Sequence, residues 1–269
     1  MIRAAILGVS GRMGCAVVRA AAETSDIRIA GAVASPASPM LGRDAGSLAG
    51  IADIGVAVTA ELTAAVAAAD VVIDFSNARA TAANLAACRA ARKALLIGTT
   101  GFAAELSAQF DSAAREIPLL IAPNTSVGVT LLIELVAQAA RSLPRSFDIE
   151  VIEAHHRMKR DAPSGTALAL GNAAALARRG QGLTPQEAEP SRSGPRREGD
   201  IGFAVVRGGD IVGEHTVLFA GTGERVSLNH SATDRAIFAR GAVQAARWLQ
   251  AQPPGRYSMR DILGYESAT

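Results

Sequence analysis

The stretch 3-RAAILGVSGRMG-14 decides the fold of the first half of the chain. Its apolar run, Arg3–Leu7, leads directly into a turn with glycine at positions 8, 11 and 14. Between a strand and a helix, the first such glycine permits a sharp turn and the second lets the backbone approach a pyrophosphate. The third lets the helix pack close to the strand, and the helix N-terminus offers unpaired N–H groups to phosphates. The stretch therefore predicts a dinucleotide-binding site.

The match to G-x-G-x-x-G is imperfect, because Ser10 stands at the position of its second glycine, and an ordinary strand-to-helix turn is the alternative. The wider context favours a nucleotide site. Over the first 125 residues, apolar runs without alternation follow one another between alanine-rich amphipathic segments, as expected for a doubly wound parallel sheet covered on both faces. Strands are expected at Arg3–Leu7, Ile27–Val33, Val71–Asp74, Leu95–Gly98 and Leu119–Ala122, helices near Met13–Ala22, Ala78–Arg92 and Ala103–Arg115, and a loop over Ala34–Gly50.

From residue 127 the pattern changes to helices on a largely antiparallel or mixed sheet. Ser164 is well placed as a helix N-cap and Gly180 as the stop of the same helix. Helices are expected at Gly128–Arg141, Ser164–Arg179 and Asp234–Gln250, strands at Phe147–Ala154, Ile201–Arg207, Ile211–Phe219 and Arg225–His230, hairpin turns at 208–209 and 221–223, and a polar loop, a candidate lid, over 181–199. We therefore expect a Rossmann-like dinucleotide-binding domain over residues 1–126 and 234–269, and an α+β domain for substrate binding and oligomerisation over 127–233.

Bulk composition narrows the class of protein. The 269 residues are 49% hydrophobic and 19% charged, with a formal net charge of +2 and ten aromatic residues, which argues for a globular protein and against a nucleic-acid binder. No apolar run is long enough for a secretory signal or a membrane span. The isolated Cys15 and Cys88 are most simply two reduced thiols. We expect a cytoplasmic protein.

Later turns point to the same nucleotide site. In a doubly wound sheet the second strand normally ends in a carboxylate that binds the adenosine ribose, but here it ends in Ala34 and Ser35. The missing acid, with Arg12 inside the glycine turn, favours tolerance of, or preference for, the 2′-phosphate of NADPH. The turns 98-GTTG-101 and 122-APNTS-126 follow two further strands and could hydrogen-bond a nicotinamide or ribose, although plain turn chemistry explains them equally well.

A second unusual stretch is 153-EAHHRMKRDAPSGTAL-168, which holds two of the four histidines and one of the two lysines. His155 and His156 are adjacent at a strand end, where neighbouring side chains face opposite ways, so no metal site is expected. Lys159 stands out because 25 arginines serve elsewhere, and lysine can give up a proton more readily than arginine. Chance placement of one lysine is the alternative.

The residues after Lys159 form a plausible anion pocket. Ser164 caps the following helix, and the N–H groups of Gly165 and Thr166 in its first turn are left for an anion. Together with His156 and Lys159 they predict a site for a small molecule that carries carboxylates.

The motifs G-V-S-G-R-M-G, G-T-T-G, A-P-N and E-A-H-H-R-M-K-R-D-A-P-S-G-T-A, in this order, resemble those of the dihydrodipicolinate reductase family, as does M-R-D-I-L at 259–263. The resemblance implies NAD(P)H-dependent reduction of a cyclic dicarboxylate in lysine and diaminopimelate synthesis, and a homotetramer built through the second domain. It implies that His155 and Lys159 are the catalytic proton-donating pair and that His156, Lys159, Ser164, Gly165 and Thr166 bind substrate. The expected cofactor-binding residues are Gly8, Val9, Ser10, Gly11, Arg12, Met13, Ala34, Ser35, Gly98, Thr99, Thr100, Ala122, Pro123, Asn124 and Thr125.

Two other functions are open from sequence alone. A non-catalytic, nucleotide-sensing Rossmann protein would explain the first domain but would leave His155 and Lys159 without a task. A metal-dependent hydrolase would use the histidines, and activity that survives a strong chelator would exclude it.

Overall fold

The computed structural model describes residues 1–102, 106–179, 196 and 199–265. The chain divides into two compact units, unit 1 (Met1–Val127 and Ala236–Thr269) and unit 2 (Gly128–Arg235). The loop expected over 181–199 lies, apart from residues 196 and 199, outside the described part of the chain.

Unit 1 contains a seven-stranded sheet in which every neighbouring pair is parallel, in the order β3-β2-β1-β4-β5-β6-β11. The order reverses between β1 and β4, and ligands of doubly wound folds bind beside such a reversal. The predicted Rossmann-like class is therefore confirmed. The strands are β1 (Ile2–Leu7), β2 (Ile27–Val33), β3 (Val58–Thr59), β4 (Val71–Asp74), β5 (Ala94–Ile97), β6 (Pro118–Ile121) and β11 (Gly255–Tyr257).

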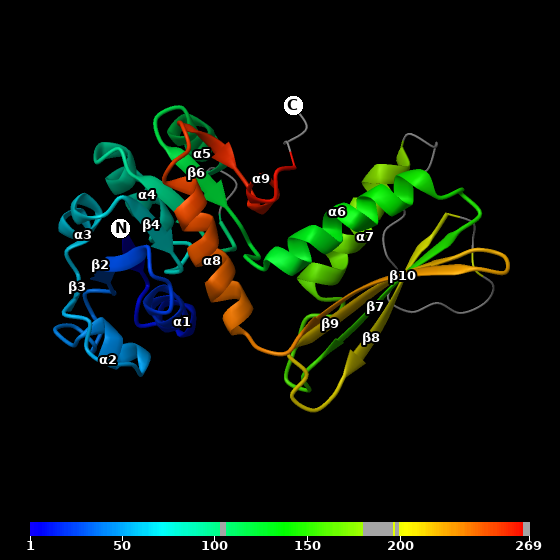
Figure 1. The fold of residues 1–269 in the computed structure, drawn as a ribbon, viewed down its shortest axis with the longest axis horizontal. Helices are drawn as coiled ribbons and strands as arrows, with labels where there is room; N and C mark the ends of the chain where they lie inside the picture. The colour runs from blue at the N-terminus through cyan, green and yellow to red at the C-terminus, as the bar shows by residue number, and fades with distance from the viewer. Residues whose placement is uncertain (103–105, 180–195, 197–198, 266–269) are drawn as a thin grey trace. The chain divides into compact units, whose positions relative to one another are not determined.

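Helices cover both faces of this sheet, which explains why its strands are apolar throughout (Figure 1). In β1, Ala4 and Ile6 face one helical layer, and Ala5 and Leu7 face the other. The first layer holds α1 (Arg12–Ala22), α2 (Ala45–Ala49), α8 (Ala236–Leu249) and α9 (Met259–Ile262); the second holds α3 (Leu62–Ala68), α4 (Thr81–Ala90) and α5 (Leu106–Ala114).

The segment Ala34–Gly50, expected to be a loop, contains the one-turn helix α2. The carboxylate of Asp44 caps it by accepting hydrogen bonds from the N–H groups of Gly46 (2.7 Å) and Ser47 (3.2 Å). The helix was missed because its single turn depends on this cap and on burial against α1, not on a periodic pattern. The short elements β3, α3, β11 and α9 were not predicted either.

Unit 2 contains a four-stranded mixed sheet in the order β10-β9-β7-β8, with β7 parallel to β8 and antiparallel to β9. Two helices, α6 (Val127–Ser142) and α7 (Gly165–Arg178), pack into one apolar core with the strands of this sheet (Figure 1). The strands are β7 (Asp148–His155), β8 (Ile201–Arg207), β9 (Gly213–Ala220) and β10 (Arg225–Ala232).

One predicted connection is wrong. The turn at 208–209 is not a hairpin, because β7 lies between β8 and β9. Ile149 and Val151 of β7 are fully buried under the helices, so β7 takes a central place with a partner on each side. The turn at 221–223 does close a hairpin, in which the N–H of Gly221 donates to the carbonyl of Glu224 at 2.9 Å. Because alternate residues of β7 face the helices, Glu153 and His155 lie on the covered face.

Candidate functional site

The glycine turn of unit 1 has a different requirement at each glycine. Gly8 has φ of 78°, and a Cβ there would lie 2.6 Å from the carbonyl oxygen of Phe75. A Cβ on Gly14 would lie 2.3 Å from the carbonyl oxygen of Gly8, so only glycine lets α1 approach the strand this closely. Gly11 is the N-cap of α1 and supplies no side-chain acceptor for the N–H groups of the first turn. The helix N-terminus is thus left available to an anion.

A cavity of about 540 Å³ lies beside this turn, at the carboxyl ends of β1, β2 and β4, where the strand order reverses. The size is typical of a small-molecule or cofactor site. Its wall consists of Leu7, Gly8, Ser10, Gly11, Val33, Ala34, Ser35, Pro36, Ala60, Leu62, Phe75, Ser76, Asn77, Ala80, Ala83 and Asn84.

The wall contains five of the predicted cofactor-binding residues: Gly8, Ser10, Gly11, Ala34 and Ser35. The others lie elsewhere among the described residues of unit 1, and several of their polar groups have internal partners. The hydroxyl of Thr125 donates to the carbonyl of Phe238 at 2.6 Å, that of Thr99 donates to the carbonyl of Asp74 at 3.4 Å, and the side-chain oxygen of Asn124 accepts from the N–H of Ser126 at 2.8 Å. Val9 is fully buried in the core.

Sequence reasoning missed the loop after β4, which supplies Phe75, Ser76 and Asn77 to the cavity wall. The fully buried carboxylate of Asp74 fixes this loop by accepting hydrogen bonds from the N–H (2.8 Å) and hydroxyl (2.6 Å) of Ser76 and from the amide of Asn84 (2.9 Å). The available signal was that this loop also follows a predicted parallel strand.

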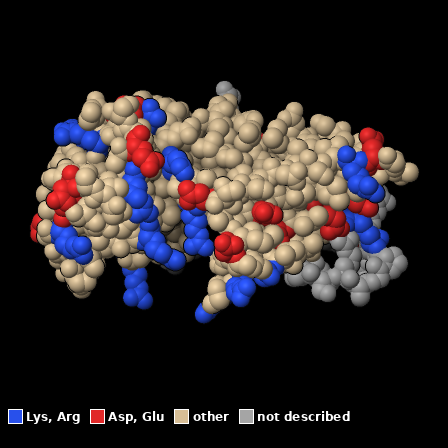
Figure 2. Space-filling model, turned by 60° about the horizontal axis from the view of Figure 1, so that its bottom comes forward, with Lys and Arg blue, Asp and Glu red and all other residues tan. Residues whose placement is uncertain are grey.

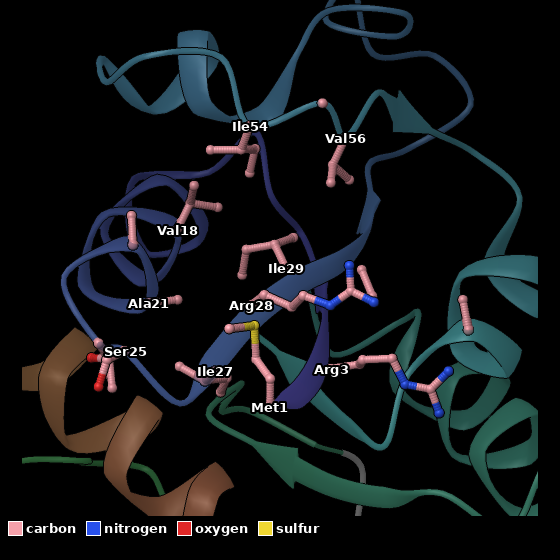
Figure 3. A pocket seen from close by; sticks show the side chains of 15 residues that line it. Met1, Arg3, Val18, Ala21, Ser25, Ile27, Arg28, Ile29, Ile54 and Val56 are labelled. Carbon is pink, nitrogen blue, oxygen red and sulfur yellow. The ribbon is translucent and has the colours of Figure 1, made fainter.

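A second cavity of about 610 Å³ lies at the amino ends of β1 and β2 (Figure 3). Side chains of Val18, Ile29 and Ile54 converge on it, while Arg3 on its wall is paired with Asp70 at 2.6 Å. Binding sites of parallel sheets lie at the carboxyl ends of the strands, so the glycine-turn cavity is the better candidate for a cofactor.

In unit 2 the candidate site is organised around the carboxylate of Glu153, which is 1% exposed. It accepts hydrogen bonds from Nδ1 of His155 (2.6 Å), from the N–H of Ser164 (3.0 Å) and from both terminal nitrogens of Arg207 (2.7 and 2.8 Å). Burial tends to raise the pKa of Glu153, but these donors outweigh burial and lower it to about 2. The carboxylate is therefore ionised at neutral pH and can only accept, so Nδ1 of His155 must carry a proton.

The environment of His155 keeps its ring neutral. Burial is the largest influence and lowers its pKa; the charge of Glu153 raises it, and those of Lys159 and Arg207 lower it further. In the neutral ring with a proton on Nδ1, Nε2 is the acceptor. Nε2 lies beside Gly213, where a Cβ would come within 3.0 Å of it, so the absence of a side chain at Gly213 leaves room for this nitrogen.

Ser164 is buried, and its hydroxyl caps α7 by accepting from the N–H of Ala167 at 3.2 Å. The same hydroxyl lies 3.1 Å from Nε2 of His215, whose ring meets that of His155 edge-on with centroids 5.1 Å apart. Burial lowers the pKa of His215 to about 4, so this ring too is neutral at neutral pH. The predicted N-cap is therefore confirmed, and the hydroxyl of Ser164 is occupied within the protein.

The loop between β7 and α7 carries the other predicted residues. The ammonium of Lys159 donates to the carboxylate of Asp161 at 2.8 Å, and Arg207 donates to the carbonyl of Asp161 at 2.7 Å. Gly165 begins α7, and its N–H has no acceptor among the described residues. The end of β7, the loop and the start of α7 thus supply the neutral imidazole of His155, the ammonium of Lys159 and the N–H of Gly165 within unit 2, a set suited to binding a carboxylate and transferring a proton.

Other kinds of site receive less support. Among residues 1–102, 106–179, 196 and 199–265, no three or more side chains of His, Cys, Asp or Glu gather as they would around a metal. On the face drawn in Figure 2, acidic and basic side chains are interspersed, which suits a small ligand better than a nucleic acid. None of the described helices is long and apolar enough to cross a membrane.

In comparisons with known proteins, both halves of the chain match models of one family. The family model "Dihydrodipicolinate reductase, N-terminus" matches residues 2–125, and "Dihydrodipicolinate reductase, C-terminus" matches residues 128–263. Proteins named 4-hydroxy-tetrahydrodipicolinate reductase from Alkalilimnicola ehrlichii and Anaeromyxobacter dehalogenans (strain 2CP-1) are 52% and 48% identical to this chain, over 97% and 98% of it and 98% of each relative.

Among solved structures, a dipicolinate-bound dihydrodipicolinate reductase from Paenisporosarcina sp. TG-14 is 25% identical with a TM-score of 0.77, covering 96% of this chain and 97% of that one. A probable dehydrogenase from Thermotoga maritima, 11% identical with a TM-score of 0.61 over 97% of this chain and 92% of that one, shares the fold.

The low pKa of Glu153 predicts how stability depends on pH. Its pKa falls from an ordinary 4.5 to about 2 on folding, so its ionised form stabilises the fold by ~3 kcal/mol at pH 7. Because the folded-state pKa is the lower one, this contribution is complete above pH 4.5 and disappears as the pH falls towards 2. The difference in free energy of unfolding between the wild type and Glu153→Gln should not shrink between pH 7 and about 5, where the titration of His155, whose pKa Glu153 raises, can only widen it, and it should shrink below about 5.

Chemical denaturation followed by circular dichroism measures this difference. Glu116→Gln is the matched control, because the carboxylate of Glu116 is paired with Arg89 on the surface of unit 1. It should show a much smaller difference. A gap for Glu153→Gln that stayed constant down to pH 2.5 would mean that the carboxylate is not held ionised by its partners.

Proposed function

The chain belongs to the dihydrodipicolinate reductase family, and from this premise we propose that it reduces 4-hydroxy-tetrahydrodipicolinate to tetrahydrodipicolinate with NAD(P)H. The observation that carries the proposal is that the likeness extends through both units, over 98% of the chain at 48% identity. A nucleotide-sensing protein would need only unit 1. The reaction belongs to the synthesis of diaminopimelate and lysine, and one water is released for each coenzyme oxidised.

The glycine-turn cavity suits the coenzyme. Its volume, the uncapped N-terminus of α1 and the backbone opened by Gly8 and Gly11 are features that a pyrophosphate requires. When bound, NAD(P)H supplies the hydride. We assign coenzyme binding to the full predicted set, with Gly8, Ser10, Gly11, Ala34 and Ser35 on the cavity wall as its best supported members.

The end of β2 argues for acceptance of NADPH. Ala34 and Ser35 lie on the cavity wall where other dinucleotide folds place an acid, and neither would repel a 2′-phosphate. Asn77 on the same wall could hydrogen-bond either form of the ribose. We therefore expect NADPH to be used at least as well as NADH.

We assign the proton chemistry to Lys159 and His155. Hydride delivery to the unsaturated ring leaves an electron-rich centre that needs a proton, and positioned proton transfer contributes about a hundred- to ten-thousand-fold in rate. The ammonium of Lys159 can donate a proton, and its hydrogen bond to Asp161 restrains the side chain against its own loop. His155 is neutral, with Nε2 free of a proton, so it can accept and pass on a proton.

We assign the substrate carboxylates to the start of α7 and to hydrogen-bond donors on the loop before it. The N–H of Gly165 and the dipole of this 14-residue helix favour an anion, and His156 and Lys159 add donors. Thr166 is retained in this set as predicted. Ser164 is assigned a supporting part, because its hydroxyl is used by Ala167 and His215.

We also propose a homotetramer built through unit 2. The face of its sheet opposite α6 and α7 exposes apolar side chains, with Ile152 on β7 38% exposed and Val206 on β8 50% exposed. Their neighbours Ala154 and Ala204 extend this apolar surface across the two strands. A second sheet would cover it.

The proposed reaction predicts oxidation of NADPH that depends on freshly generated cyclic substrate, followed by the loss of absorbance of the reduced coenzyme. Activity should persist in a strong chelator, since no step needs a metal. Parallel assays with NADH test the argument from Ala34, which a strong preference for NADH would contradict. Purified protein that bound NADPH without consuming it would support the sensing alternative instead.

Removing the two proton-transfer side chains should affect turnover more than binding. We expect Lys159→Ala and His155→Ala to lower kcat by about a hundred-fold or more while coenzyme affinity changes little. Lys159→Arg should also be poor, because guanidinium hardly deprotonates. Arg157→Lys on the same loop is the control and should keep near-normal kcat. Full activity of Lys159→Arg would mean that residue 159 supplies only a charge.

The tetramer predicts that charge on the open sheet face disrupts assembly. The double variant Ile152→Asp and Val206→Asp should sediment as smaller species than the wild type in analytical ultracentrifugation, because buried unpaired carboxylates oppose association. Leu176→Asp, at an exposed position of α7 in the same unit, should leave the assembly unchanged. A wild-type monomer, or a tetramer indifferent to the double variant, would contradict this arrangement.

A further inference from the structure

We propose that Glu153 is a positioning residue for the reductase reaction: held by Arg207, it fixes His155 in the tautomer whose Nε2 exchanges the proton. The proposal rests on the proposed function only in calling the proton transfer part of that reaction. The tautomer itself is a property of unit 2 and can be measured without substrate.

The contacts of Glu153 leave His155 a single arrangement. Oε2 accepts from Nδ1 of His155 at 2.6 Å and from Arg207 at 2.7 Å, while Oε1 accepts from Arg207 at 2.8 Å and from the N–H of Ser164 at 3.0 Å. With four donors on two oxygens and 1% exposure, the carboxylate has little freedom to rotate or to take up water. The imidazole that binds it is held at the same time in orientation and in protonation pattern.

Arg207 also contacts the loop between β7 and α7 that carries Lys159. It is the last residue of β8, paired with His155 of β7, and it reaches both Glu153 and the carbonyl of Asp161. Asp161 in turn accepts from Lys159 at 2.8 Å. Within this ion pair the two partners have different contacts: Glu153 contacts the ring of His155, while Arg207 also reaches the loop that carries Lys159, and Arg207 remains in place when only Glu153 is changed.

The variant Glu153→Gln distinguishes a residue that positions His155 from one that only packs in the interior. A glutamine has nearly the same shape, but its amide oxygen would stay at the Oε1 position, towards Nη2 of Arg207 and the N–H of Ser164, and its NH₂ group would take the Oε2 position, towards Nδ1 of His155, with loss of the contact from Nη1 of Arg207. Nδ1 would then have to accept and Nε2 would carry the proton. The change reverses the tautomer while leaving the packing of β7 almost unchanged.

The direct test is an imidazole ¹⁵N–¹H spectrum of protein labelled at its four histidines, with His155→Ala used for assignment. We expect a proton on Nδ1 of His155 in the wild type and on Nε2 in Glu153→Gln. The midpoint of the His155 titration should move to lower pH in the variant, since Glu153 raises the pKa of the ring against burial, Lys159 and Arg207. His215, the other ring against His155, should remain neutral in both. A wild-type ring protonated on Nε2 alone would overturn the proposal.

Kinetics supplies the second test. Glu153→Gln should lower kcat by about a hundred-fold with a smaller change in KM. Combined with His155→Ala it should cause no further loss, because Glu153 acts through that ring. Glu150→Gln is the matched control, since it makes the same change on the same strand but on the opposite face, beside Arg196. Additive losses in the double variant would mean that Glu153 is only structural.

The outcomes separate the two proposals. If the wild type fails to reduce the cyclic substrate but its spectrum shows the predicted tautomer, the assigned reaction is wrong and the positioning arrangement stands. If the wild type is active and the losses add, the positioning role is wrong and the reaction stands. Should Glu153→Gln fail to fold, the wild-type spectrum and Arg207→Lys, which keeps the charge but loses the forked contact, still decide the matter: Arg207→Lys should retain the Nδ1–H tautomer with a lower kcat.

Discussion

The arrangement of unit 2 depends on one buried carboxylate. Glu153 lies on a strand between Val151 and His155 on the face covered by α6 and α7, where an unpaired charge would be very costly. Its four donors come from β7, β8 and the start of α7, so the charge is tolerated only when these three elements are in place together. The same requirement places His155, the N-terminus of α7 and the loop with Lys159 in one site. The contacts that stabilise the fold of unit 2 are therefore the same contacts that assemble its candidate site.

In unit 1 the constraint is steric: the backbone at Gly8 and Gly14 leaves no room for a side chain. A side chain on Gly14 would collide with the backbone of Gly8, and one on Gly8 would collide with the loop after β4. The close approach that these glycines allow puts the open N-terminus of α1 beside the point where the strand order reverses. The cavity beside this turn is formed by backbone and uncharged side chains, so the proposed coenzyme site needs no cluster of basic residues and is compatible with a net charge of +2.

Features that depend on residues close together in the sequence could be predicted, and features that depend on contacts between distant segments could not. The glycine turn and the N-cap at Ser164 depend on residues a few positions apart, so spacing alone indicated them. The loop after β4 was missed because its place beside β1 depends on strand order, which is set by distant segments. His155 and Lys159 were noticeable because histidine and lysine are rare here. Arg207 was not, since it is one of 25 arginines and its contact with Glu153 spans 54 residues.

Stability alone does not explain why the carboxylate of Glu153 is buried against a partly buried Arg207. A buried ion pair is a poor stabiliser relative to apolar residues of similar size, because desolvation offsets most of the attraction. An apolar pair at these positions could hold β7 to β8, but it could not accept the proton of Nδ1 or the N–H of Ser164. His155 is also a ring whose pKa burial lowers, and the negative charge beside it is what keeps proton uptake by Nε2 within reach. The charge is thus best understood as a requirement of the neighbouring imidazole, and Arg207 as the group that keeps this charge ionised inside the protein.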